Sequence, residues 1–142
     1  MGAFITEVRP RWSDMDAYGH VNHANTVTLL EEARVALLFT EAARQGADGM
    51  ARGVVVARLV VDYLMPLVAD GTPVRVAMSV REMRHAAFTI DYKVHSGPLE
   101  EMPAVTAQTM LVPYDTANGR PRRLTENERD FLAAYRSGSN GA

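Results

Sequence analysis

The sequence predicts an α+β domain in which an antiparallel sheet of five or six strands wraps around one long helix, with a short C-terminal helix after it. Apolar residues recur at helical spacing between residues 24 and 45, where no proline or glycine occurs. The segments that follow alternate apolar and polar residues at the period of strands, and tight turns join them. Because only one crossover helix is available, an antiparallel sheet is favoured over a doubly wound parallel one.

Composition and charge indicate one soluble globular domain. The chain has 142 residues, of which 47% are hydrophobic and 23% are charged, a balance typical of a single folded core. We expect one domain over residues 1–142, with a core at about 4–115 and a C-terminal loop and short helix at 116–136. The net charge of −2 offers no basic excess to neutralise phosphates, so nucleic acid is not an expected partner.

The chain contains no cysteine, which excludes several kinds of bond and site. Disulfides, thiolate nucleophiles and cysteine-based zinc sites are excluded, and the composition fits a reducing compartment. No basic start followed by an apolar run occurs at the N-terminus, and no segment is long and apolar enough to span a bilayer. The sequence therefore predicts a cytoplasmic protein without a membrane partner.

The first elements are a strand and the long helix. Residues 4–12 are predicted to form the strand, with Pro10 marking an edge or a bulge because proline cannot donate to the ladder. Asn22 is a good N-cap for the helix of residues 24–45, and residues 46–53 are the turn out of it. Apolar residues recur along the helix at Val27, Leu30, Leu37 and Leu38.

The next segment, residues 54–67, is the most strand-like. Its alternate residues are apolar and predict one face against the helix, namely Val55, Ala57, Leu59, Val61, Tyr63 and Met65. Arg58 and Asp62 interrupt the other face, which we expect to meet water or a partner.

Three more strands and a short helix complete the chain. The strands are predicted at residues 73–83, 87–95 and 103–114. In residues 87–95, four apolar side chains alternate with polar ones: Phe88, Ile90, Tyr92 and Val94. Thr125 and Glu128 form a capping box that opens the C-terminal helix. The apolar side of that helix is predicted to consist of Phe131, Leu132 and Tyr135.

The loop between the first strand and the long helix contains several side chains that could act in catalysis or binding. It contains Asp14, Asp16, His20, Asn22 and His23. A carboxylate just before a helix N-terminus faces unpaired N–H groups and the positive end of the helix dipole. Such an arrangement can bind and polarise an oxygen-bearing substrate.

These residues also carry a family resemblance. The pattern D-x-D-x-x-G-H-V-N at residues 14–22, followed by E-E-A-R at 31–34, resembles the acyl-CoA thioesterases of the hotdog fold. Within that fold it is most similar to the hydroxybenzoyl-CoA thioesterase-like branch. The run VVVARLVVDYLMPLVADG at residues 54–71 is similar to the next strand of that family, which ends in D-Y-x-x-P and a glycine turn. The resemblance covers about residues 5–115.

The resemblance implies roles for the loop residues. The second aspartate of D-x-D, Asp16, would be the catalytic base or nucleophile, and a backbone N–H from His23 or its neighbour would polarise the carbonyl. His20 would position substrate or water, and Asn22 would contact the thioester region. The alternative roles, from the residues alone, are that Asp16 caps a turn, that His20 orders the loop and that Asn22 caps the helix. The resemblance also makes Glu31 on the helix a reserve candidate for the catalytic carboxylate, and the alternative is an ion-paired glutamate at the surface or an interface.

Other polar clusters have weaker assignments. Arg81, Arg84 and His85 could contact the phosphates of coenzyme A, because arginine binds phosphate oxygens in pairs. A second basic cluster, later in the chain, could do the same. Solvated surface charge is an equal alternative for each cluster. The later cluster is Arg120, Arg122 and Arg123. His20 and His23 near Asp14 and Asp16 have the ligand types for zinc or iron, but their spacing straddles a helix start, and no metal is expected.

The sequence thus predicts hydrolysis of an acyl-CoA thioester to a free acid and CoA, with no cofactor because the coenzyme A moiety belongs to the substrate. A non-catalytic protein that binds acyl-CoA or an acyl carrier is the alternative, and a hotdog dehydratase or hydratase is a third. A lone sheet of this kind would leave an unsatisfied edge strand. The family resemblance implies a homodimer with active sites at the interface, or a homotetramer built from two dimers.

Overall fold

The computed structural model describes residues 2–68, 70–96 and 102–137. Its sheet has the strand order β1-β3-β4-β5-β2, and every pairing in it is antiparallel. The two-residue strand β6 (Arg120–Pro121) pairs with β5. The other strands are β1 (Phe4–Val8), β2 (Val54–Tyr63), β3 (Val74–Met83), β4 (Phe88–His95) and β5 (Val105–Asp115). The predicted α+β hotdog fold is confirmed.

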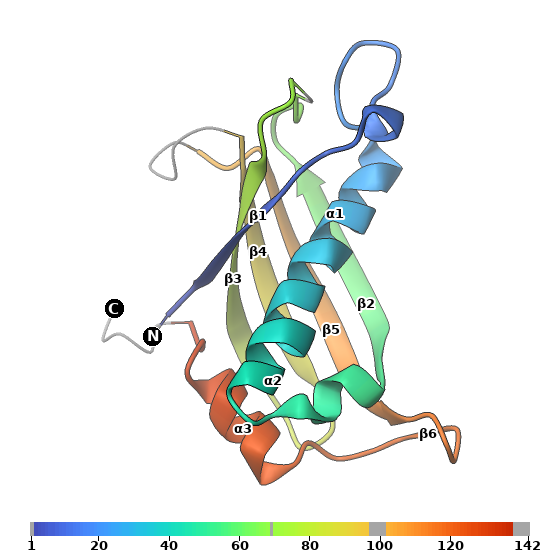
Figure 1. Ribbon diagram of the computed structural model, residues 1–142, viewed down its shortest axis with the longest axis vertical. Helices are drawn as coiled ribbons and strands as arrows, with labels where there is room; N and C mark the ends of the chain where they lie inside the picture. The colour runs from blue at the N-terminus through green and yellow to red at the C-terminus, as the bar shows by residue number, and fades with distance from the viewer. Residues whose placement is uncertain (1, 69, 97–101, 138–142) are drawn as a thin grey trace.

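One long helix runs across the sheet (Figure 1). It consists of α1 (His23–Val35), the π-helical segment η2 (Ala36–Glu41) and α2 (Ala42–Arg44), so it begins and ends one residue earlier than the sequence predicts. The N-cap is Asn22, whose side chain accepts a hydrogen bond from the N–H of Ala24. The predicted cap is therefore confirmed.

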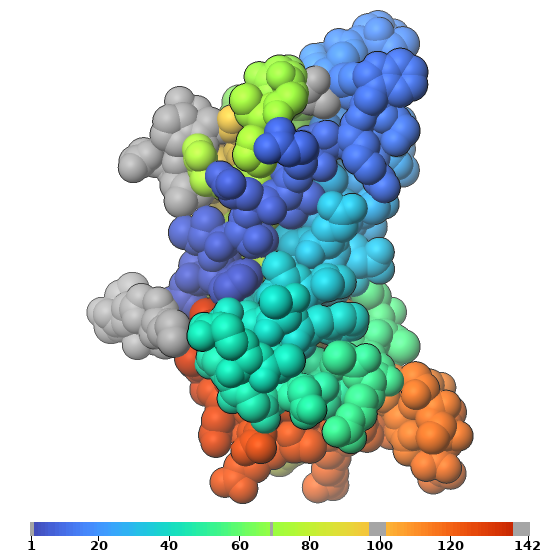
Figure 2. Space-filling model, viewed as in Figure 1, coloured from blue at the N-terminus to red at the C-terminus, as the bar shows by residue number. Residues whose placement is uncertain are grey.

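The hydrophobic core lies between this helix and the inner face of the sheet. The helix contributes Leu29, Leu30, Ala33, Leu37, Leu38 and Ala42, which are all almost fully buried. The predicted alternation in β4 is also confirmed, because Phe88, Ile90, Tyr92 and Val94 are each about 1% exposed or less. Figure 2 shows the helix covering the sheet on this face, with β2 visible beside it.

The first strand is shorter than predicted. It ends at Val8, and residues Trp12–Asp14 form a short 3-10 helix, η1. The backbone N–H of Arg11 donates to the Asp14 carboxylate rather than to a neighbouring strand. The proline at position 10 has no N–H to offer a ladder, so the chain leaves the sheet before it.

The register of β2 differs from the predicted alternation. A β-bulge lies between Val56 and Arg58, so two residues of β2 oppose one of β5 at this point. Val56 pairs with Leu111 and Leu59 pairs with Thr109, and both partners are buried under the helix. Because the bulge shifts the period, Val55 and Ala57 do not lie on the predicted inner face, and that part of the prediction is wrong. Beyond the bulge the prediction is confirmed, because the partners of Leu59, Val61 and Tyr63 on β5 are all buried. The strand also ends at Tyr63, four residues early.

Two short helical elements, at residues 48–52 and 126–133, lie at one end of the sheet (Figure 1). The predicted turn at residues 46–53 contains the 3-10 helix η3 (Asp48–Arg52). The capping box is confirmed: Thr125 and Glu128 cap α3 (Glu126–Ala133) reciprocally. The predicted apolar side of this helix is buried, namely Phe131, Leu132 and Tyr135. In the described residues, no helix is both long enough and apolar enough to cross a membrane.

Candidate active site

The loop before α1 is held in place from both sides. Asp14 is 1% exposed, and its carboxylate accepts hydrogen bonds from the backbone and guanidinium of Arg11. The Arg11 side-chain hydrogen bond is the main reason that the pKa of Asp14 lies below its ordinary value. The carbonyl of Asp14 accepts from the N–H of Asn22, and Val21 donates to the carbonyl of Leu67. Asp14 therefore orders the loop.

Asp16 lies at the turn of this loop. Its Oδ1 accepts the backbone N–H groups of Tyr18 at 2.8 Å and of His20 at 3.1 Å. The hydrogen bond from Tyr18, reinforced by the one from His20, holds the pKa of the Asp16 carboxyl below its ordinary 3.8. Gly19 has a φ of +78°, which lets the chain turn back so that the N–H of His20 reaches Asp16. Asp16 is thus a fixed anion, and within the described residues its Oδ2 carries no hydrogen bond.

The first turn of α1 supplies polar N–H groups next to this loop. The helix begins at His23, and Asn22 caps the N–H of Ala24 at 2.9 Å. Within the part of the chain that the structure describes, the N–H of His23 has no hydrogen-bond acceptor. A free N–H at the positive end of a helix can donate to an oxygen that gains negative charge.

Tyr63 at the end of β2 fixes this turn against the sheet. Its hydroxyl donates to the carbonyl of His23 at 2.5 Å, and the two rings meet edge to face. Partial desolvation at the end of β2 raises the pKa of Tyr63. Sequence reasoning assigned Tyr63 only to the apolar face of a strand. Its position in the D-Y-x-x-P pattern, just before a strand end, is the signal that could have identified it.

Together these elements line one cavity of about 340 Å³ that is open to solvent. Asp16, His20 and His23 line its polar side, so the structure brings together three of the predicted site residues. Thr26 lines the rest together with mostly apolar side chains: Val21, Tyr63, Leu64, Met65, Pro66, Leu67 and Val105. Asn22 acts on the site through the helix cap. In Figure 1 the loop lies at the same end of the sheet as the end of β2.

A sequence model of the thioesterase-like superfamily matches residues 10–134, which includes all of these residues. The chain belongs to the thioesterase-like superfamily. Membership makes it an enzyme of the thioesterase class, and it confirms the family that the loop motif predicts. A search of curated proteins found no match.

Solved structures share the fold of this chain. A predicted thioesterase from Bacillus stearothermophilus has a TM-score of 0.78 at 22% identity, with 95% of this chain and 97% of that one covered. A thioesterase from Thermus thermophilus, solved with coenzyme A and zinc, has a TM-score of 0.73 at 27% identity and covers 92% of each chain. A 1,4-dihydroxy-2-naphthoyl-CoA thioesterase from Synechocystis has a TM-score of 0.74 at 18% identity, with 92% and 96% covered.

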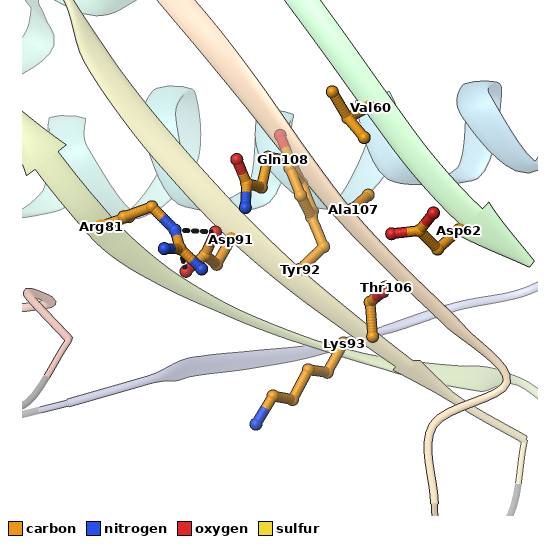
Figure 3. Close-up of a pocket in the computed structure, with 9 residues that line it drawn as sticks. All are labelled: Val60, Asp62, Arg81, Asp91, Tyr92, Lys93, Thr106, Ala107 and Gln108. Carbon is orange, nitrogen blue, oxygen red and sulfur yellow. Dashed lines mark hydrogen bonds and ion pairs between the residues drawn. The ribbon is translucent and has the colours of Figure 1, made fainter. Parts of the chain in front are cut away.

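The first basic cluster of this thioesterase lies away from the cavity. Met83, just before Arg84 and His85, pairs with Phe88 at the end of the sheet opposite Tyr63. Figure 3 shows Arg81 on the outer face, where its Nε contacts both carboxylate oxygens of Asp91 at 2.9 Å. The structure therefore does not bring Arg81, Arg84 and His85 together with Asp16, and contact with coenzyme A phosphates stays a prediction.

In the second basic cluster of the thioesterase, one arginine is paired with a buried glutamate. Arg122 binds both carboxylate oxygens of Glu128, at 2.9 and 2.8 Å, and the carbonyl of Gly49. Arg120 and Arg123 are exposed.

Glu31 is also exposed and lies further along α1, where it does not line the cavity that contains Asp16. Over residues 2–68, 70–96 and 102–137, no group of three or more metal-binding side chains could hold an ion.

Proposed function

We propose that this thioesterase hydrolyses acyl-CoA thioesters, with the Asp16 carboxylate as base or nucleophile. One observation supports the proposal above the others: a fixed aspartate anion and the free N–H of a helix start line the same cavity. The Thermus thermophilus thioesterase solved with coenzyme A supports a CoA substrate.

The geometry suits either route to the free acid. As a nucleophile, Asp16 would attack the thioester carbonyl, form a mixed anhydride and release the CoA thiolate, and water would then cleave the anhydride. As a base, it would take a proton from a water molecule that attacks the same carbon. In both routes the carbonyl oxygen becomes negative and would accept the N–H of His23. No cofactor enters either route.

The proposal predicts release of free CoA thiol from a panel of acyl-CoAs that differ in chain length and aromatic character. Thiol release can be followed with a chromogenic disulfide reagent, since the chain itself has no cysteine to react. At least one member should be turned over at a rate typical of enzymes, about 1 s⁻¹ or faster. Tight binding without turnover of any member would instead indicate a non-catalytic acyl-CoA-binding protein.

We also propose that two copies pair through β2. Within the described residues β2 pairs with β5 alone, so one side of a ten-residue strand has no ladder partner. Five of its apolar side chains are exposed by 37–48%, namely Val55, Val56, Leu59, Val60 and Tyr63. Long apolar edges associate with other strands, and an antiparallel pairing of two β2 strands about a two-fold axis would cover both copies. It would also enclose the cavity beside Tyr63.

The substitution Val60→Lys tests this pairing, because it places a charge on β2 of both copies. The wild type should sediment as a dimer or tetramer at micromolar concentration, and the variant should dissociate at least tenfold more readily. Ile5→Lys is the matched control, since Ile5 is 49% exposed on β1, the strand at the other edge. A wild type that is monomeric at micromolar concentration would contradict the proposal.

A further inference from the structure

Arg34 is a nearly buried cation with an incomplete set of partners. Its side chain is only 13% exposed. Within the described residues its one side-chain hydrogen bond goes to the hydroxyl of Tyr92 at 3.3 Å, and that hydroxyl in turn pairs with Thr109 at 2.6 Å. Its ion-pair partner Glu31 is 66% exposed and lies 3.8 Å away, beyond hydrogen-bond distance. A guanidinium has five N–H donors, so most of them are free to bind a ligand.

The space beside Arg34 lies in line with the cavity that contains Asp16. His23, Val27, Leu30 and Arg34 follow one another three or four residues apart, so they lie along one face of α1. His23 lines the cavity of about 340 Å³, and the other three line a second hollow of about 210 Å³. On the sheet side, Tyr63 lines the first hollow, and the second lies against Leu59 and Val56 of the same strand.

The second hollow is lined by four apolar and four polar side chains. Val27, Leu30, Val56 and Leu59 form the walls, and polar atoms are contributed by Glu31, Arg34 and the threonines 28 and 109. A largely apolar hollow that contains a fixed cation matches a hydrocarbon chain with an anionic end. Arginine binds a carboxylate through two parallel N–H···O bonds, which fixes the orientation of an anionic end group.

We infer that Arg34 binds the distal carboxylate of a dicarboxylic acyl group whose thioester end lies at Asp16. This inference rests on the proposed thioester hydrolysis and names its substrate class. The eleven residues from His23 to Arg34 correspond to a rise of roughly 16 Å, and helix side chains lean back toward the N-terminus. Because of this lean, the span is shorter than the rise, and an extended chain advances by less than its bond length of about 1.5 Å per carbon. The matching acyl group therefore has on the order of ten carbons. Hydrolysis releases CoA and a free dicarboxylate.

Paired substrates test the inference directly. Sebacoyl-CoA, as the monothioester with a free carboxylate, is compared with decanoyl-CoA, which has the same carbon number and no charge. The wild type should prefer sebacoyl-CoA in kcat/KM. In Arg34→Met the ratio of the two kcat/KM values should fall by roughly ten- to a hundredfold, the range for a charged hydrogen-bonded pair. Binding of free sebacate, measured by calorimetry, should weaken by a similar factor without any need for turnover.

Two further variants make the result specific. Glu31→Gln removes the carboxylate that competes for Arg34, so the preference for sebacoyl-CoA should increase. Arg44→Met is the matched control, because Arg44 forms the same i,i+3 pair with Glu41 but is 70% exposed outside the hollow. It should leave the ratio unchanged.

The possible results separate the two hypotheses. If no acyl-CoA is hydrolysed while sebacate binding still depends on Arg34, the proposed function fails and the carboxylate site stands. If the wild type shows no preference, or if Arg34→Met reduces both kcat/KM values equally, the inference is overturned. Weaker self-association of Arg34→Met in sedimentation, with an unchanged ratio, would also overturn it and would assign the guanidinium to a second copy of the chain.

Discussion

Replacing Asp16 with asparagine should lower kcat by roughly a hundredfold or more, the scale for loss of an acid–base group, with the fold intact. The asparagine Oδ1 can still accept the N–H groups of Tyr18 and His20, so the loop keeps its hydrogen bonds. What the exchange removes is the negative charge, and with it both the base and the nucleophile. Thiol release from the best acyl-CoA substrate, together with thermal unfolding, measures the two effects separately.

Asp115→Asn is the matched control for this variant. Asp115 also accepts two backbone N–H groups on Oδ1, from Ala117 at 3.0 Å and Asn118 at 3.1 Å, but it lies at the other end of the sheet. Activity of this variant should equal that of the wild type. If Asp16→Asn is equally active, Asp16 is only a turn cap and its catalytic role is refuted.

The same assignment has a pH signature in the wild type. The pKa of Asp16 lies below its ordinary 3.8, so the reactive carboxylate is lost only as the pH falls through that lowered value. We expect no acid limb from Asp16 in kcat/KM between pH 5 and 7. A limb centred near 6.5, the ordinary pKa of histidine, would instead transfer the role to an imidazole.

Arg122→Met should destabilise the fold by about 3–5 kcal/mol, the cost of leaving a buried charge without its partner. Glu128 is 1% exposed and depends on Arg122 for two charged hydrogen bonds. Burial acts to raise the pKa of Glu128, and the hydrogen bonds from Arg122 and Thr125 outweigh it, so that the pKa is lowered. Urea unfolding at pH 7 measures the loss.

Two comparisons identify the cause of this loss. Arg123→Met removes an exposed arginine next to the same position and should change stability by less than about 0.5 kcal/mol. Adding Glu128→Gln to Arg122→Met removes the orphan charge and should recover part of the stability. Because folding lowers the pKa of Glu128, the ionised carboxylate stabilises the folded wild type at pH values above 4.5, the ordinary pKa of glutamate. This stabilisation is lost as the pH falls through the lowered pKa. The difference between wild type and Arg122→Met should therefore shrink in acid.

The sequence by itself determined the elements that short-range spacing encodes. Asn22 as the helix cap, the alternation of Phe88 and Ile90 in β4, and the Thr125–Glu128 capping box were all predicted correctly. Each depends on neighbours within a few residues, where periodicity and local hydrogen bonds decide the conformation. The loop motif likewise identified Asp16, His20 and His23, which the structure brings to one cavity.

Contacts between residues distant in the chain were decided only by the tertiary structure. The bulge after Val56 follows from pairing with β5, and no local pattern in residues 54–63 encodes it. The bonds of Tyr63 to His23 and of Arg34 to Tyr92 join residues 40 and 58 positions apart. The sequence shows which side chains are charged, but packing decides their partners. That is why Arg122, a candidate phosphate ligand in the sequence, is instead paired with a buried glutamate.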